Sequence, residues 1–543
     1  MAQKIKIQGK ELQEISHPLD SQFNSIVKSF SLDAARAGAD IIDIGAQDDD
    51  IIGLEFDDGG EWIGHIEDIH QIFGEHIQVR GGDNLFPGSL NANQNDRGLK
   101  EIGIKILNLI RGQKKISEAA ARLIAQQVDK KVMSTPGLFK VTDNGDLKPA
   151  TLDTNAKKYL LYLHGTLSSF NGSFGDLYLS DDKAVCQAIH QTFGECVLAL
   201  QHYTLSASPW ENALEILNRL PQGTTLDIIS HSRGGLIADI LASCDHRNGQ
   251  IGYNEAEISL ANGDDALVKT LKQITKLAKQ KSIRIDKVIR VACPARGTTL
   301  LSNSLDHFLN GLLRAVGLAF GGKTNTIYQY IRGLICDVIS ARLTPGVMPG
   351  ILAMVPDSIP QQLINRAALS LKNHLVVIEG DSEAGAKFWR SVLVVLSNLY
   401  YREENDFVVN TSSMRYGALR DFGLQFFRSQ DETTSHFNYF KNQNTRDAIL
   451  DAILTPAGLA INRFEQRNSS EIDRGVFIDL FKKYKAISYE TITGQKPIVL
   501  LIPGVMGTHL RIGDDIVWID LGEIGKGRMV TDLPSSNKAV DTK

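Results

Sequence analysis

Ser232 stands at the junction of two different sequence patterns. The apolar run Leu226–Ile229 precedes it, and a helical pattern begins at Leu236. A strand, a sharp turn and a helix with a serine at the apex form the context of a nucleophile elbow. Such a turn strains the backbone at the serine, so the residues two before and two after it must be small. Here they are Ser230 and Gly234, and Ser230 replaces the first glycine of the G-x-S-x-G pattern. An ordinary strand-to-helix turn is the alternative interpretation.

A serine hydroxyl attacks a carbonyl carbon when a base takes its proton and an acid orients that base. Of the histidines that follow Ser232, His436 is best placed, because it lies in a polar loop between the last expected strand and a closing helix. Asp406 is the preferred acid, since apolar residues and a serine pair follow it, and Asp381, directly after an apolar run, is the competitor. The alternative for each of them is an ordinary solvated residue.

The oxyanion that forms on the attacked carbonyl needs backbone N–H donors that are fixed in advance. One donor should come from Arg233, directly after the serine. The other should come from Thr166 or Leu167, in the loop after the first apolar run of this region, because Gly165 lets the backbone turn its amides inward. We expect His164 in the same loop to orient the loop rather than to titrate.

Composition argues against several classes of function. The formal net charge is −5 and no basic cluster stands out, which argues against nucleic-acid binding. No His, Cys or Asp cluster has the spacing of metal ligands, so we expect neither a metal nor an organic cofactor. The five cysteines are odd in number and scattered, which is typical of free thiols in a reducing cytosol. With no signal peptide and no apolar run of membrane-spanning length, the expected location is cytoplasmic.

Apolar strand-like runs alternate with helical patterns from residue 157 to about residue 460. This alternation is typical of an α/β fold with a mostly parallel sheet and helices on both faces. The expected strands are Tyr159–Leu163, Cys196–Leu200, Leu226–Ile229, Val288–Ala292, Leu375–Ile378 and Leu424–Phe427, and the expected helices include Pro209–Leu220, Ala266–Lys279 and Asn442–Leu454. Such a sheet would bring the serine and the histidine loop to the edge where the strands end.

Residues 1–150 form a region in which we recognise no chemistry. Ile51–Phe56 and Glu61–Gly64 flank a turn that is rich in Asp and Gly, which predicts a hairpin. Apolar positions with helical spacing predict helix over residues 99–131, and Leu138–Val141 predicts another strand. We expect a small α+β accessory domain, through which the chain could bind a protein partner or form an oligomer.

Three further segments lie outside the alternating pattern. Residues 300–370 hold apolar helical runs with proline and glycine between them, and we expect a cap of movable pieces, with fixed helical core as the alternative. Residues 461–494 are expected to form a linker helix. Residues 495–543 begin with a fresh strand and are expected to start a second hydrolase-like domain that is not completed.

With these residues placed, residues 157–455 resemble the lipase-like α/β-hydrolases, especially the glycosylphosphatidylinositol inositol-deacylase-like branch. The motifs that carry this resemblance are the H-G loop His164–Thr166, the elbow Ser230–Gly234, the loop Pro294–Thr298, the acid loop Asn405–Val409 and the histidine His436. The resemblance implies an α/β-hydrolase fold with a helical cap and a triad of Ser232, Asp406 and His436.

Separately, Pro497–Leu510 together with Trp518 resembles the opening strand and oxyanion loop of lecithin:cholesterol-acyltransferase-like hydrolases. No elbow follows this segment, so it would not be catalytic by itself. Two lipase-like beginnings in one chain suggest a fragment of a large multidomain protein from a bacterium.

Three functions fit these observations. The first is a serine hydrolase that cleaves an acyl ester through an acyl-enzyme, on a small-molecule or lipid substrate and with peripheral contact to a membrane. Apolar side chains of the 300–370 segment, among them Met348 and Met354, would line its acyl pocket. The second is a serine peptidase or amidase with the same triad, because a fold does not fix a substrate. The third is an interaction module that keeps the fold without activity.

Overall fold

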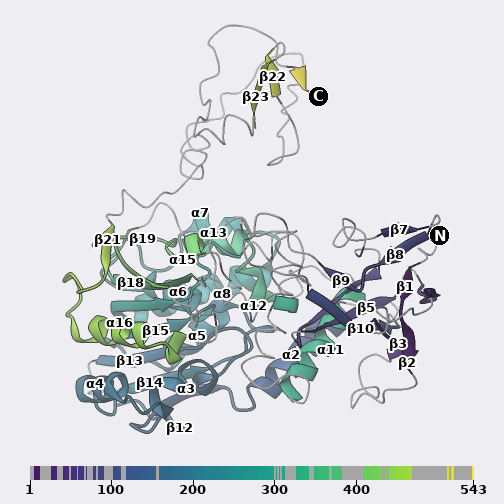
Figure 1. Cartoon of the computed structure of the whole chain (residues 1–543). Helices are drawn as coiled ribbons and strands as arrows, with labels where there is room; N and C mark the ends of the chain where they lie inside the picture. Colours follow the sequence, from purple (N-terminus) through teal and green to yellow (C-terminus); the bar gives the residue numbers. More distant parts are fainter. Residues whose placement is uncertain are drawn as a thin grey trace, which may run out of the picture. The chain divides into compact units, whose positions relative to one another are not determined.

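Figure 1 shows the computed structural model of the chain. Outside gaps of four residues or fewer, it describes residues 5–467 except 13–25, 33–40, 70–77, 91–101, 112–117, 314–325, 341–347, 382–408 and 431–435, and beyond residue 467 it describes only 510–512, 515–518 and 541–542. The chain divides into two units, Met1–Arg474 and Gly475–Lys543, and each is described by itself.

A nine-stranded sheet is the main element of the first unit, in the order β12-β11-β14-β13-β15-β16-β18-β20-β21. Its strands are β11 (Gly137–Val141), β12 (Leu147–Pro149), β13 (Lys158–Leu163), β14 (Val197–Gln201), β15 (Thr225–His231), β16 (Arg284–Val291), β18 (His374–Asp381), β20 (Leu424–Gln430) and β21 (Glu465–Arg467). The strands from β14 to β20 pair in parallel, whereas β11 and β21 pair antiparallel to their neighbours. All six expected strands are confirmed.

Helices cover both faces of this sheet (Figure 1). The helices α5 (Pro209–Arg219), α6 (Gly234–Ala242) and α8 (Asp265–Lys281) pack together on one face, and α3 (Phe170–Leu179), α4 (Ala184–Phe193) and α16 (Gln443–Leu454) lie on the other. Local sequence explains where they begin, because Ser208 and Glu211 form a capping box at α5 and Asp264 caps α8. The short helix α7 (Glu255–Leu260) precedes α8. This arrangement is the α/β-hydrolase fold.

The sheet extends beyond the limits that the sequence indicated. Strands β11 and β12 form a hairpin that joins the sheet through β14, so the boundary expected at residue 150 lies after two strands of this sheet. At the other edge, β21 pairs with β20 where the linker helix was expected to begin. The expectation of helix at residues 465–467 is therefore wrong, and residues 468–494 lie outside the described part of the chain.

The N-terminal residues form two small sheets. Their orders are β4-β1-β8-β7 and β2-β3-β10-β5-β6, with β9 paired to β10. The strands are β1 (Lys6–Gln8), β2 (Lys10–Leu12), β3 (Ile26–Ser31), β4 (Ile41–Asp43), β5 (Ile51–Phe56), β6 (Glu61–His65), β7 (Gln78–Arg80), β8 (Asp83–Phe86), β9 (Ser89–Leu90) and β10 (Ile102–Ile110). The expected hairpin is confirmed as β5 and β6, which pair antiparallel.

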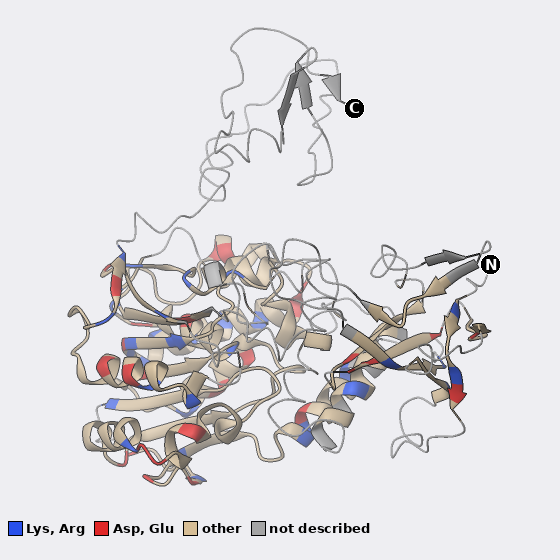
Figure 2. Cartoon of the chain, viewed as in Figure 1, with Lys and Arg blue, Asp and Glu red and all other residues tan. Residues whose placement is uncertain are grey.

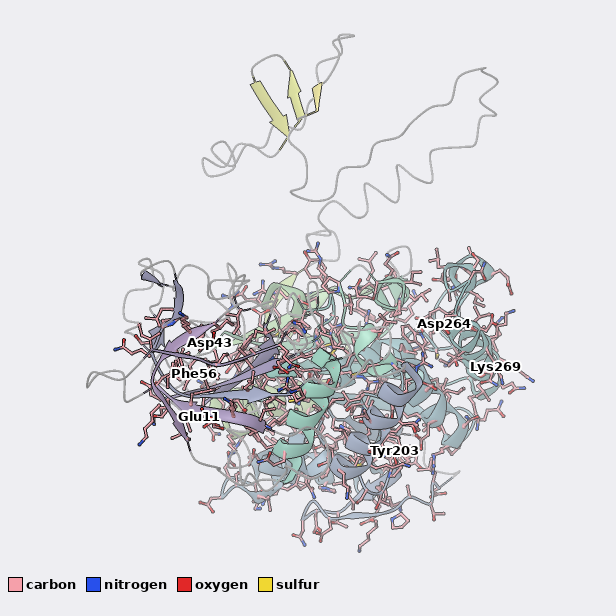
Figure 3. The ribbon with its side chains drawn as sticks, turned by 90° about the vertical axis from the view of Figure 1, so that its right-hand side faces the viewer. Glu11, Asp43, Phe56, Tyr203, Asp264 and Lys269 are labelled. Carbon is pink, nitrogen blue, oxygen red and sulfur yellow. The ribbon has the colours of Figure 1, made fainter. Side chains whose placement is uncertain are left out.

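The helix expected over residues 99–131 is only half right. Helix α2 (Glu118–Val132) is present, but Ile102–Ile110 is the strand β10. The start of this segment reads Ile-Gly-Ile-Lys-Ile, which has the period of two that a strand requires. Alternate side chains of the N-terminal sheet enter different cores: Ile51 joins the main core, while Ile52 and Phe56 (labelled in Figure 3) join a second core.

The N-terminal sheet is attached to the helical segment between β16 and β18. The side-chain amide of Asn310 donates to Ile63 O at 2.7 Å, and its oxygen accepts from Ile63 N–H at 2.8 Å. Helix α11 (Thr326–Ser340) adds Tyr328 and Arg332, which donate to the buried carboxylate of Glu61 at 3.1 and 2.9 Å. The edge strand β6 is thereby held by polar contacts along its length.

The remaining elements are short. In the first unit they are α12 (Pro349–Leu352), α13 (Ile359–Asn365), β17 (Ser370–Leu371), α15 (Thr411–Met414), β19 (Leu419–Arg420) and the 3₁₀ helix η6 (Tyr439–Lys441). In the second unit β22 (Leu510–Ile512), β23 (Asp515–Trp518) and β24 (Asp541–Thr542) form a small antiparallel sheet. The strand expected at the start of residues 495–543 lies outside the described residues. No helix in the described part is both long and apolar enough to cross a membrane.

Candidate active site

Ser232 occupies a strained turn between β15 and α6. Its φ angle is +51°, a value in the left-handed region that L-residues rarely adopt. Two main-chain bonds hold this conformation: Ser232 N–H donates to Val291 O at 2.8 Å, and Gly235 N–H donates to Ser232 O at 2.9 Å. The turn therefore has the geometry of a nucleophile elbow, in which the strain belongs to the site.

Three glycines allow the backbone to approach this turn closely. A Cβ atom at Gly234 would lie 2.2 Å from Leu163 O, and one at Gly235 would lie 2.4 Å from Cys293 Sγ. A Cβ atom at Gly165 would lie 2.8 Å from the Cβ atom of Ser232. The small residues of the elbow and of the H-G loop are thus required by packing.

His436 lies against the serine. Its Nε2 atom is 2.8 Å from Ser232 Oγ, and both side chains are buried. At this distance the hydroxyl can donate to an unprotonated imidazole nitrogen, which is what general-base catalysis requires. The structure thus brings together two of the three expected triad residues. Asp406 lies outside the described residues, and Asp381 is described only as the last residue of β18, not in its side chain.

A chain of hydrogen bonds runs from His436 through His231, the residue before the serine, to Ser173 and Ser168. His231 Nε2 lies 2.8 Å from His436 O and must carry the proton, because a carbonyl oxygen only accepts. Ser173 Oγ therefore donates to His231 Nδ1, at 3.2 Å, and in turn lies 3.0 Å from Ser168 Oγ. Burial lowers the pKa of His231 to about 3, so the ring is neutral and its tautomer is fixed. Sequence reasoning missed this chain, since only the fold brings its members together.

The three candidate oxyanion donors differ in whether their N–H group already has an acceptor within the protein. Leu167 has a φ of +51°, and its N–H donates to Thr204 Oγ1 at 2.9 Å. Among the described residues, the N–H groups of Thr166 and Arg233 have no acceptor. Of the three residues expected from the sequence, Thr166 and Arg233 are thus available as donors, whereas Leu167 is already occupied.

The side chain of Arg233 fixes the other side of the elbow. It is fully buried and donates to Gly350 O at 2.7 Å, to Asn212 Oδ1 at 3.1 Å and to Ala207 O at 2.6 Å. Burial lowers the pKa of Arg233 to about 10. The guanidinium joins the elbow to α5, to α12 and to the loop after β14.

The segment 348–355 borders the site and is held firmly. Gly350 N–H donates to Leu205 O at 3.0 Å, and Met354 O accepts from Thr298 N–H at 2.9 Å. Met354 Sδ lies 4.0 Å from Thr166 Oγ1, beside the expected oxyanion donor. These bonds hold this part of the expected cap against the neighbouring loops, and the choice between a movable cap and fixed core stays a prediction. Met348 and Met354 are both buried in it.

The loop Pro294–Thr298 forms the next side of the site. Gly297 has a φ of +88°, and a Cβ atom there would lie 2.6 Å from Met354 O, so only glycine fits. Ser413, in α15, donates to Gly297 O at 2.6 Å and accepts from Arg296 N–H at 3.1 Å. These bonds connect the loop to the residues that follow the expected acid loop.

A buried ionic cluster, which sequence reasoning missed, contacts the end of α15. Asp239, on the elbow helix α6, accepts from Arg290 and Arg420, each at 2.6 Å, and all three side chains are buried. Arg290 also donates to the carbonyl oxygens of Met414 and Tyr416, at 2.9 and 2.6 Å. The cluster ties the elbow helix to the chain around residues 414–420.

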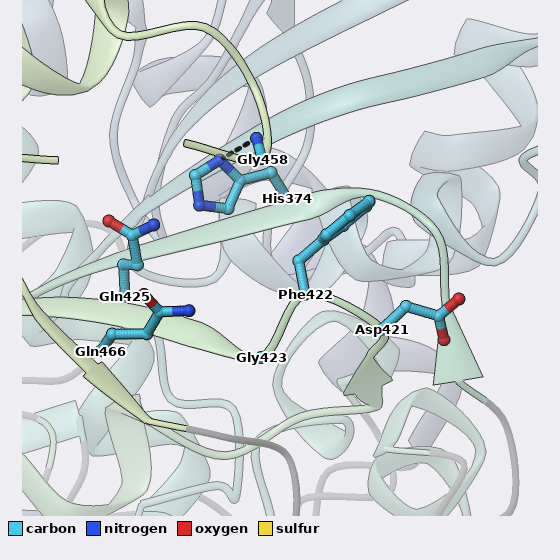
Figure 4. Close-up of a pocket in the computed structure, with 7 residues that line it drawn as sticks. All are labelled: His374, Asp421, Phe422, Gly423, Gln425, Gly458 and Gln466. Atoms are coloured by element: carbon cyan, nitrogen blue, oxygen red, sulfur yellow. Dashed lines mark hydrogen bonds between the residues drawn. The ribbon is translucent and has the colours of Figure 1, made fainter. Parts of the chain in front are cut away.

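His374 is the first residue of β18 and lies at the opposite end of the sheet from Ser232, which follows the end of β15. His374 lines a pocket of about 420 Å³ together with Asp421, Phe422 and Gln425 (Figure 4). Its Nδ1 atom accepts from Gly458 N–H at 3.1 Å. Burial lowers the pKa of His374 to about 4. This histidine has no contact with Ser232 and takes no part in the site.

The block that contains these residues matches a known protein family. A family model described as "Domain of unknown function (DUF7379)" matches residues 132–254 and 266–454. The chain belongs to this family. The matched residues include the elbow, His436 and every strand from β11 to β20, so the DUF7379 domain of this chain is the α/β-hydrolase unit. A search of curated proteins gives no significant match.

Solved structures that are similar to this chain include three bacterial enzymes. Lipase BlEst2 of Bacillus licheniformis in its mature form is 15% identical, with 59% of this chain and 99% of that chain covered and a TM-score of 0.29. Lipase 1 from Pelosinus fermentans is 12% identical, with 53% and 95% covered and a TM-score of 0.33. Phospholipase PlaB from Legionella pneumophila is 10% identical, with 55% and 61% covered and a TM-score of 0.31.

The described residues contain no group of His, Cys, Asp and Glu side chains that could hold a metal ion. All five cysteines are described, and each is a free thiol. Basic and acidic residues are interspersed over the described elements of the DUF7379 domain (Figure 2). The expectations of no cofactor and no nucleic-acid partner stay predictions.

Proposed function

We propose that the DUF7379 domain of this chain is a serine hydrolase that cleaves an acyl ester through an acyl-enzyme. The observation that carries the proposal is the distance of 2.8 Å between Ser232 Oγ and His436 Nε2, at a turn whose serine has a φ of +51°. A strained serine with a buried histidine at hydrogen-bond distance is what an activated nucleophile requires. An interaction module would need neither the strain nor this pairing.

The reaction follows from these contacts. Ser232 Oγ bonds to the carbonyl carbon while its proton passes to His436 Nε2, and the N–H groups of Thr166 and Arg233 bind the oxyanion. His436 then gives the proton to the leaving alkoxide, which departs as an alcohol and leaves an ester on Ser232. A water molecule, deprotonated by His436, attacks this ester, and the acid product leaves as Ser232 regains its proton. Asp406 is the proposed acid that orients His436.

The proposed substrate is an ester with an apolar acyl group. Met354, beside Thr166, and Met348 belong to a buried apolar segment, and methionine side chains fit irregular apolar ligands. Peripheral contact with a membrane and a cytoplasmic location accompany this proposal, as does an interaction through residues 1–150.

Labelling with a fluorophosphonate probe tests the nucleophile. The probe should modify Ser232 in the folded protein, and Ser232→Ala should abolish both labelling and ester hydrolysis. Removal of a triad nucleophile costs about 10⁴-fold or more in kcat. The matched control is Ser259→Ala, since Ser259 is an exposed serine of α7. Full activity of Ser232→Ala on an ester that the protein hydrolyses would reject the proposal.

The choice of acid is tested by two matched carboxylate variants. If Asp406 orients His436, Asp406→Asn should lower kcat by about 10⁴-fold, because the asparagine favours the wrong imidazole tautomer. Asp381→Asn should have a far smaller effect. The reverse ranking, with both proteins folded, would transfer the role to Asp381.

A series of p-nitrophenyl esters from acetate to palmitate tests the substrate class. Each methylene that the site buries should add about 0.8 kcal/mol of binding until the pocket is full, which is about fourfold in kcat/KM. A flat or falling series beyond acetate would remove the lipid-like substrate. Cleavage of peptides or amides in place of esters would favour a peptidase.

A further inference from the structure

Several parts of the molecule meet at residues 204–207, which follow Tyr203 (labelled in Figure 3) and which we name the 204–207 loop. Leu167 N–H donates to Thr204 Oγ1 at 2.9 Å, and Gly350 N–H donates to Leu205 O at 3.0 Å. The guanidinium of Arg233 donates to Ala207 O at 2.6 Å. The H-G loop, the segment 348–355 and the elbow therefore share one support. The position of that support decides where the oxyanion donors lie.

Asp129, on helix α2, holds this loop from below. Its carboxylate is buried and accepts from three main-chain N–H groups, those of Thr204, Leu205 and Ser206, at 2.9, 3.1 and 2.7 Å. It also accepts from the hydroxyls of Thr204 at 3.3 Å and Ser206 at 2.6 Å. Bonds from N–H and O–H groups to an ionised acceptor are the strong ones, and several on one carboxylate fix a loop in a single conformation.

The directions of these bonds form one consistent chain. A threonine hydroxyl has one proton, and here it is directed to Asp129, which leaves the oxygen of Thr204 free to accept from Leu167 N–H. Leu167 is held in this way at a φ of +51°. The same bond occupies the N–H of Leu167 and leaves that of Thr166 for a substrate.

We infer that Asp129 and Thr204 are positioning residues for the oxyanion hole, and that α2 thereby controls the rate of the proposed reaction without contacting the substrate. This inference rests on the proposed function of Ser232. Asp129 lies just before the residues that the family model matches, in a region where the sequence showed no chemistry. The N-terminal part of the chain therefore contributes to the rate of hydrolysis.

Two variants separate positioning of the oxyanion donors from general support of the loop. Each of them removes one hydroxyl group that donates to the Asp129 carboxylate. Thr204→Val removes the acceptor of Leu167 N–H and keeps the shape of the side chain. Ser206→Ala, the matched control, removes a shorter bond to the same carboxylate and has no contact with Leu167. Loss of one oxyanion donor costs about 10²- to 10³-fold in kcat. A misplaced donor should cost less, so we expect Thr204→Val to lower kcat by about 10- to 100-fold with KM nearly unchanged.

The readouts exclude a loss of folded protein. The concentration of active sites is taken from the end point of fluorophosphonate labelling, and kcat is expressed per labelled site. The inhibition constant of a boronic acid, whose tetrahedral adduct uses the oxyanion donors, should rise in Thr204→Val by the same factor as kcat falls. The pH profile of kcat/KM should keep its midpoint. Thr204→Ser retains the hydroxyl that accepts from Leu167 N–H, so its kcat should lie within about threefold of the parent value. This difference is far smaller than the loss expected when an oxyanion donor is removed.

Two outcomes would overturn the inference: equal kcat values per labelled site in Thr204→Val and Ser206→Ala, or a boronic acid that binds Thr204→Val as tightly as the parent protein. If Thr204→Val does not fold, Asp129→Asn and Thr204→Ala are measured in the same way against Ser206→Ala. The proposed function fails separately, because it requires Ser232→Ala to be inactive. An inactive Ser232→Ala beside a fully active Thr204→Val rejects only the role of the 204–207 loop.

Discussion

Lowering the pH from 7.5 to 5.5 should destabilise the protein strongly, because four histidines are buried in their neutral form. Burial lowers the pKa of His164 and of His231 to about 3 and that of His374 to about 4, and it holds the pKa of His202 well below its ordinary value. His164 and His202 stack with ring centroids 3.9 Å apart, so a proton on one ring would place a charge beside the other. Arg233 lowers the pKa of both further.

The size of the effect follows from proton linkage. In the unfolded chain these histidines have an ordinary pKa of about 6.5. Below that pH they are protonated in the unfolded state, whereas they stay neutral in the folded state. Stability is therefore complete above pH 6.5 and is lost as the pH falls toward the folded values. Between pH 7.5 and 5.5 each histidine should cost about 1.4 kcal/mol, and four should cost about 5.5 kcal/mol. That is a large part of an ordinary free energy of unfolding of about 5–15 kcal/mol.

Urea unfolding at a series of pH values measures this effect. The slope of the unfolding free energy at pH 5.5 should correspond to an uptake of between three and four protons, about one for each histidine. His374→Gln keeps an acceptor for Gly458 N–H and lies far from the site, so it should reduce the uptake by about one proton and leave kcat unchanged. A slope of less than one proton, or a loss below about 1 kcal/mol over this range, would refute the assignment of four buried neutral histidines.

Three further predictions concern single substitutions. Asp239→Asn leaves two buried arginines without a counter-charge and should lower the unfolding free energy by about 3–5 kcal/mol in urea, and a loss below 1 kcal/mol would contradict the buried cluster. Gly165→Ala places a Cβ atom 2.8 Å from that of Ser232, so labelling of the serine should slow by at least about tenfold, with a fall of about 1–3 kcal/mol in stability. Glu61→Gln should speed hydrogen exchange in β5 and β6 while kcat stays constant, and unchanged exchange would show that Glu61 does not hold this sheet.

Periodicity predicted the central sheet because its strands are buried on both faces and read as unbroken apolar runs. The strand β13, for example, is buried at every position from Tyr159 to Leu163. The sequence did not predict which strands pair with each other, because strand pairing depends on contacts between residues that are distant in the chain. Leu138–Val141 was recognised as a strand, yet only the pairing with β14 shows which sheet it joins. Ile102–Ile110 was misread because its later residues, after the alternating start, lose the period of two.

The candidate site was predictable where one local pattern carried it. The elbow around Ser232 combines strand, small residues and helix within ten residues, and His436 follows from its place in the chain order. The support of the oxyanion loop was not predictable, because an aspartate on a helix and a threonine after a strand have no signature of their own. The same holds for Asp239, whose partners lie 51 and 181 residues away in sequence.

The pairing of Asn310 with Ile63 also bears on association between molecules. Strand β6 is the last strand of its sheet, and an open edge offers main-chain groups to any other extended chain. The carboxamide of Asn310 uses both main-chain groups of Ile63, as a neighbouring strand would. It therefore acts as a one-residue substitute for a strand and blocks this edge against intermolecular β-pairing. Loss of the Asn310 side chain would turn a closed edge into a template for aggregation.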